Sequence, residues 1–362
     1  MRKLTARIVA AVLTVSMLGG CSASNTSQGE KAAGAAGGAT EAAQEKNEDT
    51  KASGEAITLR YSHTVAEQEG HPWTVATNTF KETLEELSGG TIMVENYPGG
   101  QLGGDTDLLD SVQLGTLDIG MISSGTIANV TNCLAGIDMP FIFDGDYEYY
   151  HEVLSGEIGQ HLLDRLAEDV EAVVPLGYAY QAWRHLWSEN GIYEISDMKG
   201  LKTRCMQSPI HIDIFQALGA TPTALPYNDI YSNMQTGTID GFEMDAAGAI
   251  NSNFFEVCKH MTYSAHFTNT PVILFSRKVW DTMSEEQRGW IKAAAYEACE
   301  ASYIAAVSTE ESYIEQLKAE GVEVIEVDLT PFQAAVADMI QKYCDSNGDV
   351  DYLVSEMQKI ER

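Results

Sequence analysis

Short apolar runs alternate with segments of helical periodicity from residue 57 onward. The first predicted strands are 57–62, 91–97 and 117–122, and the helices between them are 72–88 and 105–114. Pro72 suits a first helical position, and Gly89-Gly90 ends that helix. Such alternation favours a largely parallel sheet with helices on both faces. Ligands of these sheets bind beyond the carboxyl ends of the strands, here at 62–64 and 123–126.

The same alternation repeats in a second block. Its predicted strands are 170–178, 182–188, 201–206 and 239–244, and its predicted helices are 209–218 and 227–236. The region from residue 57 to Arg362 is long enough for two α/β domains. We therefore predict an α/β protein with two domains.

The longest predicted helix begins near Ser284, whose spacing to Gln287 matches a capping box. Its helical pattern extends to Lys318, before Gly321. A helix of about 35 residues is about 50 Å long, which exceeds one domain. We expect it to run along both domains, followed by a strand at 322–327 and a helix that begins at Thr330.

The N-terminus has the features of an export signal. Three basic residues precede a mostly apolar run, 8–18, which is too short to span a membrane. The run ends in Leu18-Gly19-Gly20-Cys21, which resembles a bacterial lipobox. We predict a lipoprotein signal peptide at 1–20 and lipidation of Cys21. The alternative is an ordinary secretory signal with an incidental cysteine.

Residues 21–55 after the signal are rich in Ser, Gly, Ala and charged residues, and they contain no aromatic side chain. Such a segment buries too little apolar surface to fold, so we expect a flexible tether to the membrane. Without residues 1–20 the chain has 19 basic and 53 acidic residues, a net charge of −34. Nucleic acid is therefore excluded as a partner that would bind through a basic surface.

The chain contains none of the common enzyme motifs: no Gly-rich phosphate loop, no HExxH and no nucleophile elbow. The five cysteines after Cys21 have no CxxC spacing, so we expect no zinc site. Residues 345–356 resemble a calcium loop, but Val350 stands where that loop needs glycine. We interpret them as a helix end, with Asp349 capping the next helix. No cofactor, metal site or catalytic residue is expected.

Two arginines lie in apolar, strand-like stretches: Arg184 in QAWRHLW and Arg204 in LKTRCM. A buried guanidinium is costly unless a charge or hydrogen bonds satisfy it. A guanidinium group can bind a carboxylate through two parallel hydrogen bonds. The residues alone leave two readings open, a ligand carboxylate or an internal salt bridge.

Several motifs, in order and at matching spacing, resemble the dicarboxylate-binding-type solute-binding proteins of tripartite ATP-independent periplasmic (TRAP) transporters. They are PGGQLG (98–103), QLGTLDIG (113–120), MPFIF (139–143), DMKGLKTR (197–204), ALGATP (217–222) and QTGTIDG (235–241). The resemblance covers nearly all of residues 57–362. It implies a two-lobed fold with a hinge and a long helix spanning both lobes. Lobe 1 would be 56–181 plus about 270–315, and lobe 2 would be 182–269 plus about 316–362.

The resemblance implies that Arg204 anchors a ligand carboxylate in the cleft between the lobes. Arg184 matches a second arginine, Gln207 a polar contact and Tyr227 an aromatic wall. The sequence departs from many relatives at Glu243-Met244-Asp245, where they carry Glu-Asn after Asp-Gly-x. The resemblance also implies membrane subunits as partners, and we expect a monomer.

The first domain adds polar candidates for ligand contacts. These are His63, Glu67, Glu69, His71, Asp105 and Ser123, and we add Glu243 and Asp245 from the second domain. Donors and acceptors beside two arginines favour a hydroxylated acid, such as a hexuronate or related sugar acid. The alternatives are a C4-dicarboxylate and, in another class, an exported enzyme acting on sugar acids. His63 with Glu67 or His71 would be that enzyme's general base.

Overall fold

The structure is a computed structural model that describes residues 56–360. The predicted signal peptide, the lipidation site Cys21 and the tether lie outside this range. Within it, no helix combines the length and the apolar composition needed to cross a bilayer.

The first sheet has five strands in the order β2-β1-β3-β10-β4. They are β1 (Ile57–Ser62), β2 (Ile92–Tyr97), β3 (Ile119–Ser123), β4 (Val173–Tyr178) and β10 (Pro271–Ser276). Strand β1 pairs in parallel with β2 and β3, as predicted. The sheet is mixed, however, because β10 runs antiparallel to both β3 and β4. This strand was not predicted, and it enters from the second sheet without a helical crossover.

The second sheet has six strands in the order β11-β9-β5-β8-β6-β7. They are β5 (Arg184–Ser188), β6 (Lys202–Cys205), β7 (Thr221–Ala224), β8 (Gly241–Met244), β9 (His260–Phe267) and β11 (Glu323–Glu326). Strand β6 is parallel to β7 and β8, whereas β5 is antiparallel to β8 and β9. Both sheets combine parallel and antiparallel pairs, whereas the alternating pattern predicted a largely parallel sheet.

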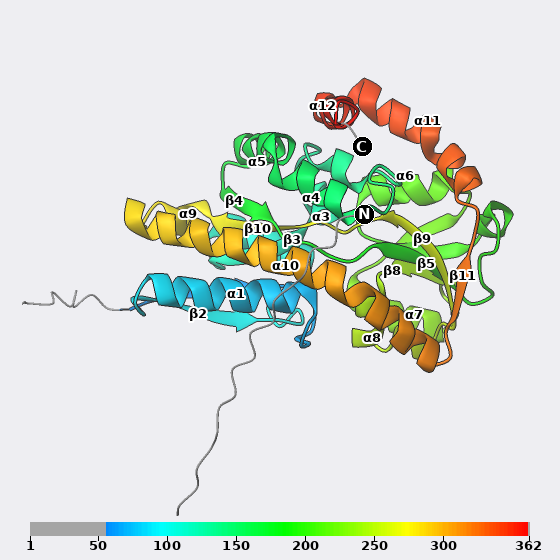
Figure 1. Ribbon diagram of the computed structural model, residues 1–362, viewed down its shortest axis with the longest axis horizontal. Helices are drawn as coiled ribbons and strands as arrows, with labels where there is room; N and C mark the ends of the chain where they lie inside the picture. Colours follow the sequence, from blue (N-terminus) through cyan, green and yellow to red (C-terminus); the bar gives the residue numbers. More distant parts are fainter. Residues whose placement is uncertain (1–55, 361–362) are drawn as a thin grey trace, which may run out of the picture. The chain divides into compact units, whose positions relative to one another are not determined.

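Helices cover both sheets, and most of the predicted ones form (Figure 1). Beside the first sheet lie α1 (Pro72–Leu87), α2 (Asp105–Leu114), α3 (Ser124–Ile127), α4 (Tyr147–Ser155), α5 (Glu157–Asp169) and α9 (Arg277–Trp280). Beside the second lie α6 (Pro209–Ala217), α7 (Ile230–Gln235), α8 (Ala246–Asn251) and α11 (Thr330–Ser346). Short 3₁₀ helices occupy Ala135–Asp138, Ile195–Met198, Tyr227–Asp229 and Phe254–Glu256. The predicted helix 227–236 is therefore a 3₁₀ turn followed by α7.

The fold has two lobes, one on each sheet, and we call them lobe 1 and lobe 2. The chain passes between them after β4 and again after β9. Helix α10 (Glu285–Ala319) contacts α1 and β4 of lobe 1 and α8 and β11 of lobe 2 (Figure 1). Ser284 caps it and forms the predicted capping box with Gln287. The sequence-based prediction of a helix along both domains is confirmed.

The last helix, α12 (Gly348–Met357), lies against lobe 1, where it contacts α5 and the 3₁₀ helix 135–138. Asn347 caps it by accepting the backbone N–H groups of Asp349 and Val350. The prediction that Asp349 is the cap is therefore wrong. Asp349 instead pairs with Arg165 of α5 at 3.2 Å, which helps to hold the end of the chain on lobe 1.

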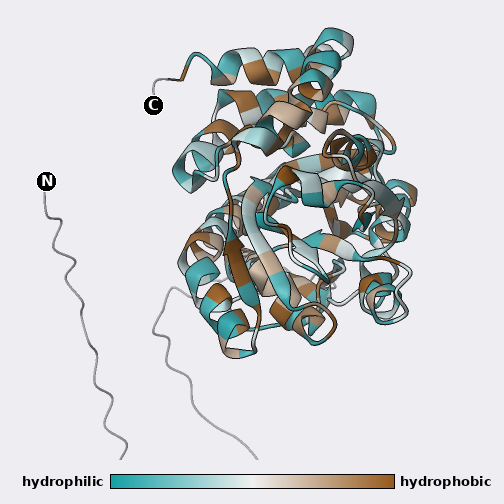
Figure 2. Cartoon of the chain, turned by 90° about the vertical axis from the view of Figure 1, so that its right-hand side faces the viewer, coloured by the Kyte–Doolittle hydropathy of each residue, from teal (hydrophilic) through white to brown (hydrophobic). Residues whose placement is uncertain are grey.

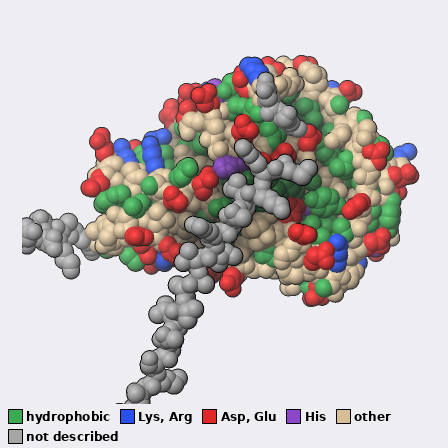
Figure 3. All heavy atoms as spheres, in the orientation of Figure 1, with side chains coloured by type: hydrophobic (Ala, Val, Ile, Leu, Met, Phe, Trp, Pro, Cys, Tyr) green, Lys and Arg blue, Asp and Glu red, His purple; other side chains and the backbone are tan. Residues whose placement is uncertain are grey.

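Four clusters of buried apolar side chains form the core. Two of them pack mainly against the first sheet, and the other two pack mainly against the second. In Figure 2 the outer helices carry hydrophobic and hydrophilic residues in turn, as expected of helices with one face on a core. Acidic side chains greatly outnumber basic ones on the face in Figure 3, in agreement with the net charge.

Candidate functional site

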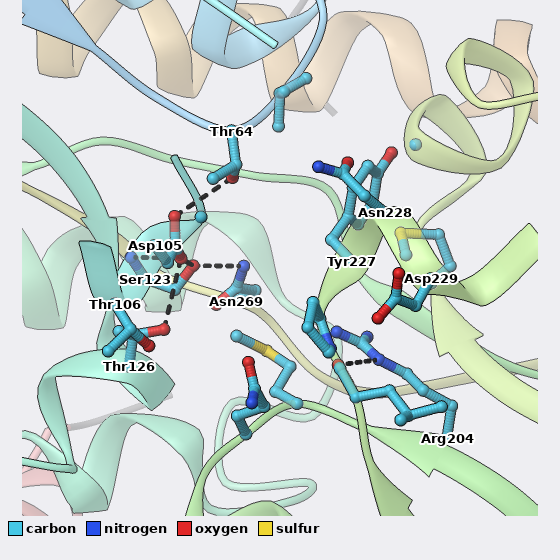
Figure 4. A pocket seen from close by; sticks show the side chains of 18 of the residues that line it. Thr64, Asp105, Thr106, Ser123, Thr126, Arg204, Tyr227, Asn228, Asp229 and Asn269 are labelled. Carbon is cyan, nitrogen blue, oxygen red and sulfur yellow. Dashed lines mark hydrogen bonds between the residues drawn. The ribbon is translucent and has the colours of Figure 1, made fainter. Parts of the chain in front are cut away.

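A cavity of about 470 Å³ lies between the two lobes. Lobe 1 contributes the segment after β1, the start of α1, the start of α2 and the end of β3 (Figure 4). Lobe 2 contributes β5, β6, residues 225–229 and the start of α8. The cavity is thus at strand ends, where ligands bind in sheets of this kind, and it has the size of a small-molecule site.

Arg184 and Arg204 both line the cavity and are almost fully buried. They come from β5 and β6, and β8 lies between these two strands in the sheet. This order places Glu243 of β8 between the two guanidinium groups. Arg184 donates through Nε to the Glu243 carboxylate, and Arg204 Nη1 donates to Glu243 Oε1 at 3.2 Å. An internal salt bridge is therefore present, as one of the two readings of the arginines expected.

The two arginines differ in how completely their donors are used. Arg184 also donates through Nη2 to the Glu243 carbonyl at 2.9 Å, and its Nη1 lies 3.7 Å from Asp245 Oδ2. Arg204 donates through Nε to the Leu225 carbonyl at 3.0 Å. Its Nη2 has no hydrogen-bond partner within residues 56–360. Arg204 therefore retains a donor for a ligand while its other donors hold the guanidinium in place.

Burial and charge act in opposite directions on these two groups. Burial is the largest single effect on the pKa of Arg184 and lowers it, but the attraction and hydrogen bond of Glu243, together with the attraction of Asp245, raise the pKa overall. Burial, with repulsion from Arg184, lowers the pKa of Arg204 despite the attraction of Glu243. Arg204 is thus the less compensated cation, and an additional carboxylate would stabilise it.

Asp245 and Gln181 extend this network towards lobe 1. Asp245 Oδ1 accepts the Gly248 backbone N–H at 2.8 Å, which caps α8, and Oδ2 accepts Gln181 Nε2 at 2.5 Å. Gln181 Oε1 in turn accepts Trp73 Nε1 of α1 at 3.1 Å. Asp245 and Glu243 are fully buried, and neither lines the cavity. They lie behind the arginines and position them.

The lobe 1 wall is built around Asp105 at the start of α2 (Figure 4). Its Oδ2 accepts the Ser123 hydroxyl and, at 3.3 Å, the Ser123 backbone N–H. Thr64 donates to Oδ1 at 3.1 Å, and Thr126 to Oδ2 at 3.4 Å. Burial raises the pKa of Asp105, and these hydrogen bonds oppose that shift. Asn269 completes this part of the wall by donating through Nδ2 to Ser123 Oγ at 3.1 Å.

His71 lines the cavity from the N-terminus of α1, where it caps the helix. Its Nδ1 accepts the Trp73 backbone N–H at 3.2 Å. Burial lowers the pKa of His71, so the ring is neutral. His63 is buried with its ring edge against Trp73 and does not line the cavity. Burial lowers its pKa to about 3.

Gln207 and Tyr227 line the lobe 2 side of the cavity, and Ser123 lines the lobe 1 side. The Tyr227 hydroxyl is bonded to Ser252, and burial raises its pKa to about 12. Glu67 and Glu69 are exposed and do not line the cavity. Of the candidates named from the sequence, the cavity wall therefore brings together Arg184, Arg204, Gln207, Tyr227, His71, Asp105 and Ser123.

Sequence reasoning did not identify Gln181 and Asn269, which both line the cavity. Gln181 lies between β4 and β5, and Asn269 lies between β9 and β10. Both segments connect the lobes, and β9 and β10 were not predicted. The buried apolar run of β10 was the signal from which the connection at 268–270 could have been found.

The geometry gives little support to a general base at His63. A pKa of about 3 leaves the ring a weak base at neutral pH. Glu67, its proposed partner, is exposed on the surface. Among residues 56–360, no group of three or more His, Cys, Asp and Glu side chains is arranged to hold a metal ion.

A family model described as bacterial extracellular solute-binding protein, family 7, matches residues 61–347. A solute-binding protein of Roseobacter denitrificans is 30% identical over 287 residues, which are 78% of this chain and 86% of the relative.

Two solved TRAP periplasmic solute-binding proteins are also similar to this chain, and each matches over 84% of it. The Polaromonas sp. JS666 protein, bound to D-erythronate, is 29% identical with a TM-score of 0.80, over 99% of its own chain. The Pseudomonas putida F1 protein, with bound D-glucuronate, is 27% identical with a TM-score of 0.80, over 98% of its own chain. The chain therefore belongs to the extracellular solute-binding proteins of family 7, which serve TRAP transporters.

Proposed function

We propose that this protein captures a hydroxylated monocarboxylic acid, a hexuronate or related sugar acid, and delivers it to TRAP membrane subunits. The ligand's carboxylate binds Arg204, and Arg184 and Gln207 contribute polar contacts. The observation that carries the proposal is the free Nη2 donor of Arg204 in the cavity wall, on a guanidinium held by Glu243 and the Leu225 carbonyl.

The chemistry of the opposite wall favours this ligand class over a C4-dicarboxylate. Asp105 is half-buried there, and the cations that line the cavity, Arg184 and Arg204, both belong to lobe 2. A second carboxylate would meet a like charge on lobe 1, whereas hydroxyl groups meet donors and acceptors. D-Erythronate and D-glucuronate, the ligands of the two solved relatives, are both hydroxylated monocarboxylates.

Titration calorimetry of the mature chain with D-glucuronate, D-galacturonate, malate and succinate tests this proposal. We expect a uronate to bind more tightly than either dicarboxylate. Arg288→Ala, which removes an arginine outside the cavity, should bind like the wild type and serves as the control. Tighter binding of succinate than of both uronates would eliminate the sugar-acid assignment and leave the transport role intact.

The protein works outside the cytoplasm, as its family does, and we propose that lipid on Cys21 holds it at the membrane. Metabolic labelling of the full chain with a palmitate analogue should mark the wild type and not Cys21→Ala. Absence of label from the exported wild type would favour the ordinary secretory signal.

We also propose that the protein releases its ligand unchanged. Incubating the protein with the sugar acid that it binds and then analysing the solution by NMR should show no new product. Product formation above that of a protein-free control would support the alternative that the protein is an enzyme acting on sugar acids.

A further inference from the structure

Two buried polar atoms in the cavity wall have no hydrogen-bond partner within residues 56–360. They are His71 Nε2 and Asn269 Oδ1, on side chains that are 0% and 7% exposed. A buried polar group without a partner is costly, so such atoms in a ligand cavity indicate where a ligand binds. Neither atom belongs to the arginine network of lobe 2.

The helix cap determines which proton His71 carries. Its Nδ1 accepts the Trp73 backbone N–H, so this nitrogen bears no proton. A neutral imidazole has one N–H, and here it must therefore lie on Nε2. The Asp245 carboxylate favours the protonated ring, but burial outweighs this effect and lowers the pKa of His71. His71 thus offers the cavity one uncharged hydrogen-bond donor.

The Ser123 hydroxyl determines the orientation of the Asn269 amide in the same way. Ser123 has one hydroxyl proton, which it donates to Asp105 Oδ2. Its oxygen then accepts from Asn269, which must present its NH₂ group. The Asn269 Oδ1 atom is left as an uncharged acceptor in the wall of the cavity.

An uncharged donor and an uncharged acceptor match the two functions of a hydroxyl group, or of hydroxyls on neighbouring carbons. We propose that His71 and Asn269 bind the hydroxyl-bearing part of the ligand and thereby select an acid whose other end is uncharged. This inference rests on the proposed function and deepens it. It assigns the carboxylate to lobe 2 and the hydroxyls to lobe 1.

The same geometry argues against an acid that is charged at both ends. The four hydrogen bonds to Asp105 come from Ser123, Thr64 and Thr126, so a ligand carboxylate there would have no cation to pair with. It would also confront the unprotonated oxygen of Asn269. A carboxylate accepts hydrogen bonds and donates none, so that oxygen would remain unsatisfied.

The experiment begins with the sugar acid that the wild type binds most tightly among D-glucuronate, D-galacturonate and D-galactonate. Its matched aldarate, D-glucarate or D-galactarate, carries a second carboxylate at the opposite end. Calorimetry should show at least tenfold weaker binding of the aldarate. Equal or tighter binding of the aldarate would overturn the inference, whereas binding of none of the three sugar acids would overturn the proposed function itself.

Two variants then remove the two atoms separately. His71→Asn keeps a side-chain acceptor for the Trp73 N–H, because Asn is a favoured N-cap, but it removes the Nε2 donor. Asn269→Leu replaces the amide with an apolar group of similar size and affects no helix cap. Each should weaken binding of the sugar acid by about 10- to 100-fold, because a ligand hydroxyl then lacks its partner.

Hexanoate, measured by competition, provides the matched ligand without hydroxyls. Its affinity should change by less than threefold in either variant. His151→Asn, at a half-buried histidine outside the cavity, is the control protein and should bind the sugar acid like the wild type. Sugar-acid affinities within threefold of the wild type in both variants would overturn the inference. So would equal losses for the sugar acid and hexanoate.

Discussion

The two walls of the cavity carry different kinds of polar side chain. The lobe 2 wall has two buried guanidinium groups that share Glu243, with Asp245 close behind. The lobe 1 wall has hydroxyls, an amide and a neutral imidazole around one half-buried carboxylate. One end of the cavity is therefore built for charge and the other for uncharged polar groups.

This contrast also explains how buried arginines persist without a ligand. Two guanidinium groups and two carboxylates balance on the lobe 2 side, so the unliganded cavity does not leave a net buried charge there. Within residues 56–360, the Nη2 group of Arg204 is left without a hydrogen-bond partner. A ligand carboxylate therefore adds to an organised site and does not have to assemble it.

The largest expected effect comes from removing the charge on which the lobe 2 wall depends. Glu243→Gln leaves two buried arginines with a single nearby carboxylate, Asp245, which lies beside Arg184. We expect the free energy of unfolding to fall by about 3–5 kcal/mol, as for other broken buried pairs. Denaturant unfolding measures it, and a bound carboxylate should restore more stability than in the wild type.

Glu168→Gln is the control for that measurement, because its pair with Arg165 is exposed. It should change stability by about 0.5 kcal/mol or less. A loss below about 1 kcal/mol for Glu243→Gln would show that the arginines do not depend on this carboxylate.

Arg204→Ala should remove the main contact with the ligand's carboxylate. We expect a loss of about 2–5 kcal/mol in binding, or roughly 30- to several-thousand-fold. Arg204→Lys should also bind weakly, because an ammonium group cannot reproduce the planar fork that reaches Glu243, the Leu225 carbonyl and the ligand. Calorimetry that places Arg204→Ala within threefold of the wild type would eliminate this role.

The uncharged histidines of lobe 1 should make the protein sensitive to acid. Burial lowers the pKa of His63 to about 3, so below pH 6.5 the unfolded chain takes up a proton that the folded chain does not. The contribution of the neutral His63 ring to the free energy of unfolding is therefore present above pH 6.5, and it is lost as the pH falls towards 3. For this residue the loss is about 1.3 kcal/mol between pH 7 and pH 5.5.

Unfolding free energies of the wild type and His63→Gln at pH 7 and pH 5.5 measure this effect. The variant should lose less stability than the wild type over this interval. Asp105 has the opposite sign, because its raised pKa makes the folded chain take up a proton first on acidification. Identical pH dependence in wild type and His63→Gln would mean that His63 is not held neutral by burial.

The smallest expected effect concerns two direct hydrogen bonds between the lobes. Asn129 of lobe 1 donates to the Gln207 carbonyl at 2.9 Å, and Asn251 of lobe 2 donates to the Ala66 carbonyl at 3.1 Å. Each should contribute about 0.5–1.5 kcal/mol to the closed arrangement. Asn129→Ala and Asn251→Ala should therefore bind the ligand about 2- to 10-fold more weakly, mainly through faster dissociation.

Stopped-flow measurement of ligand dissociation tests these two variants. Asn96→Ala, which removes a hydrogen bond between β2 and α1 within lobe 1, is the matched control. Small-angle scattering of the wild type should show a smaller radius of gyration when ligand is bound, since both lobes contact it. Unchanged dissociation rates would mean that these two hydrogen bonds do not stabilise the closed arrangement, and that the ligand and the apolar contacts do so alone.

Local patterns in the sequence determined much of this protein. Apolar runs marked most strands of both blocks, although not β7, β9 and β10, and Ser284 with Gln287 marked the start of the long helix, because these signals depend on neighbouring residues. The spaced motifs indicated the family, and the apolar context of Arg204 indicated that this residue needs a partner. Those inferences required no knowledge of which distant segments meet.

The tertiary structure alone decided which residues share a wall. Glu243 reaches both arginines because β8 lies between β5 and β6, an order that pairs segments about 40 and 60 residues apart. Asn269 reaches Ser123 because β10 returns to the first sheet from the second. Strand order arises from packing and pairing between distant segments, so it cannot be predicted from local patterns.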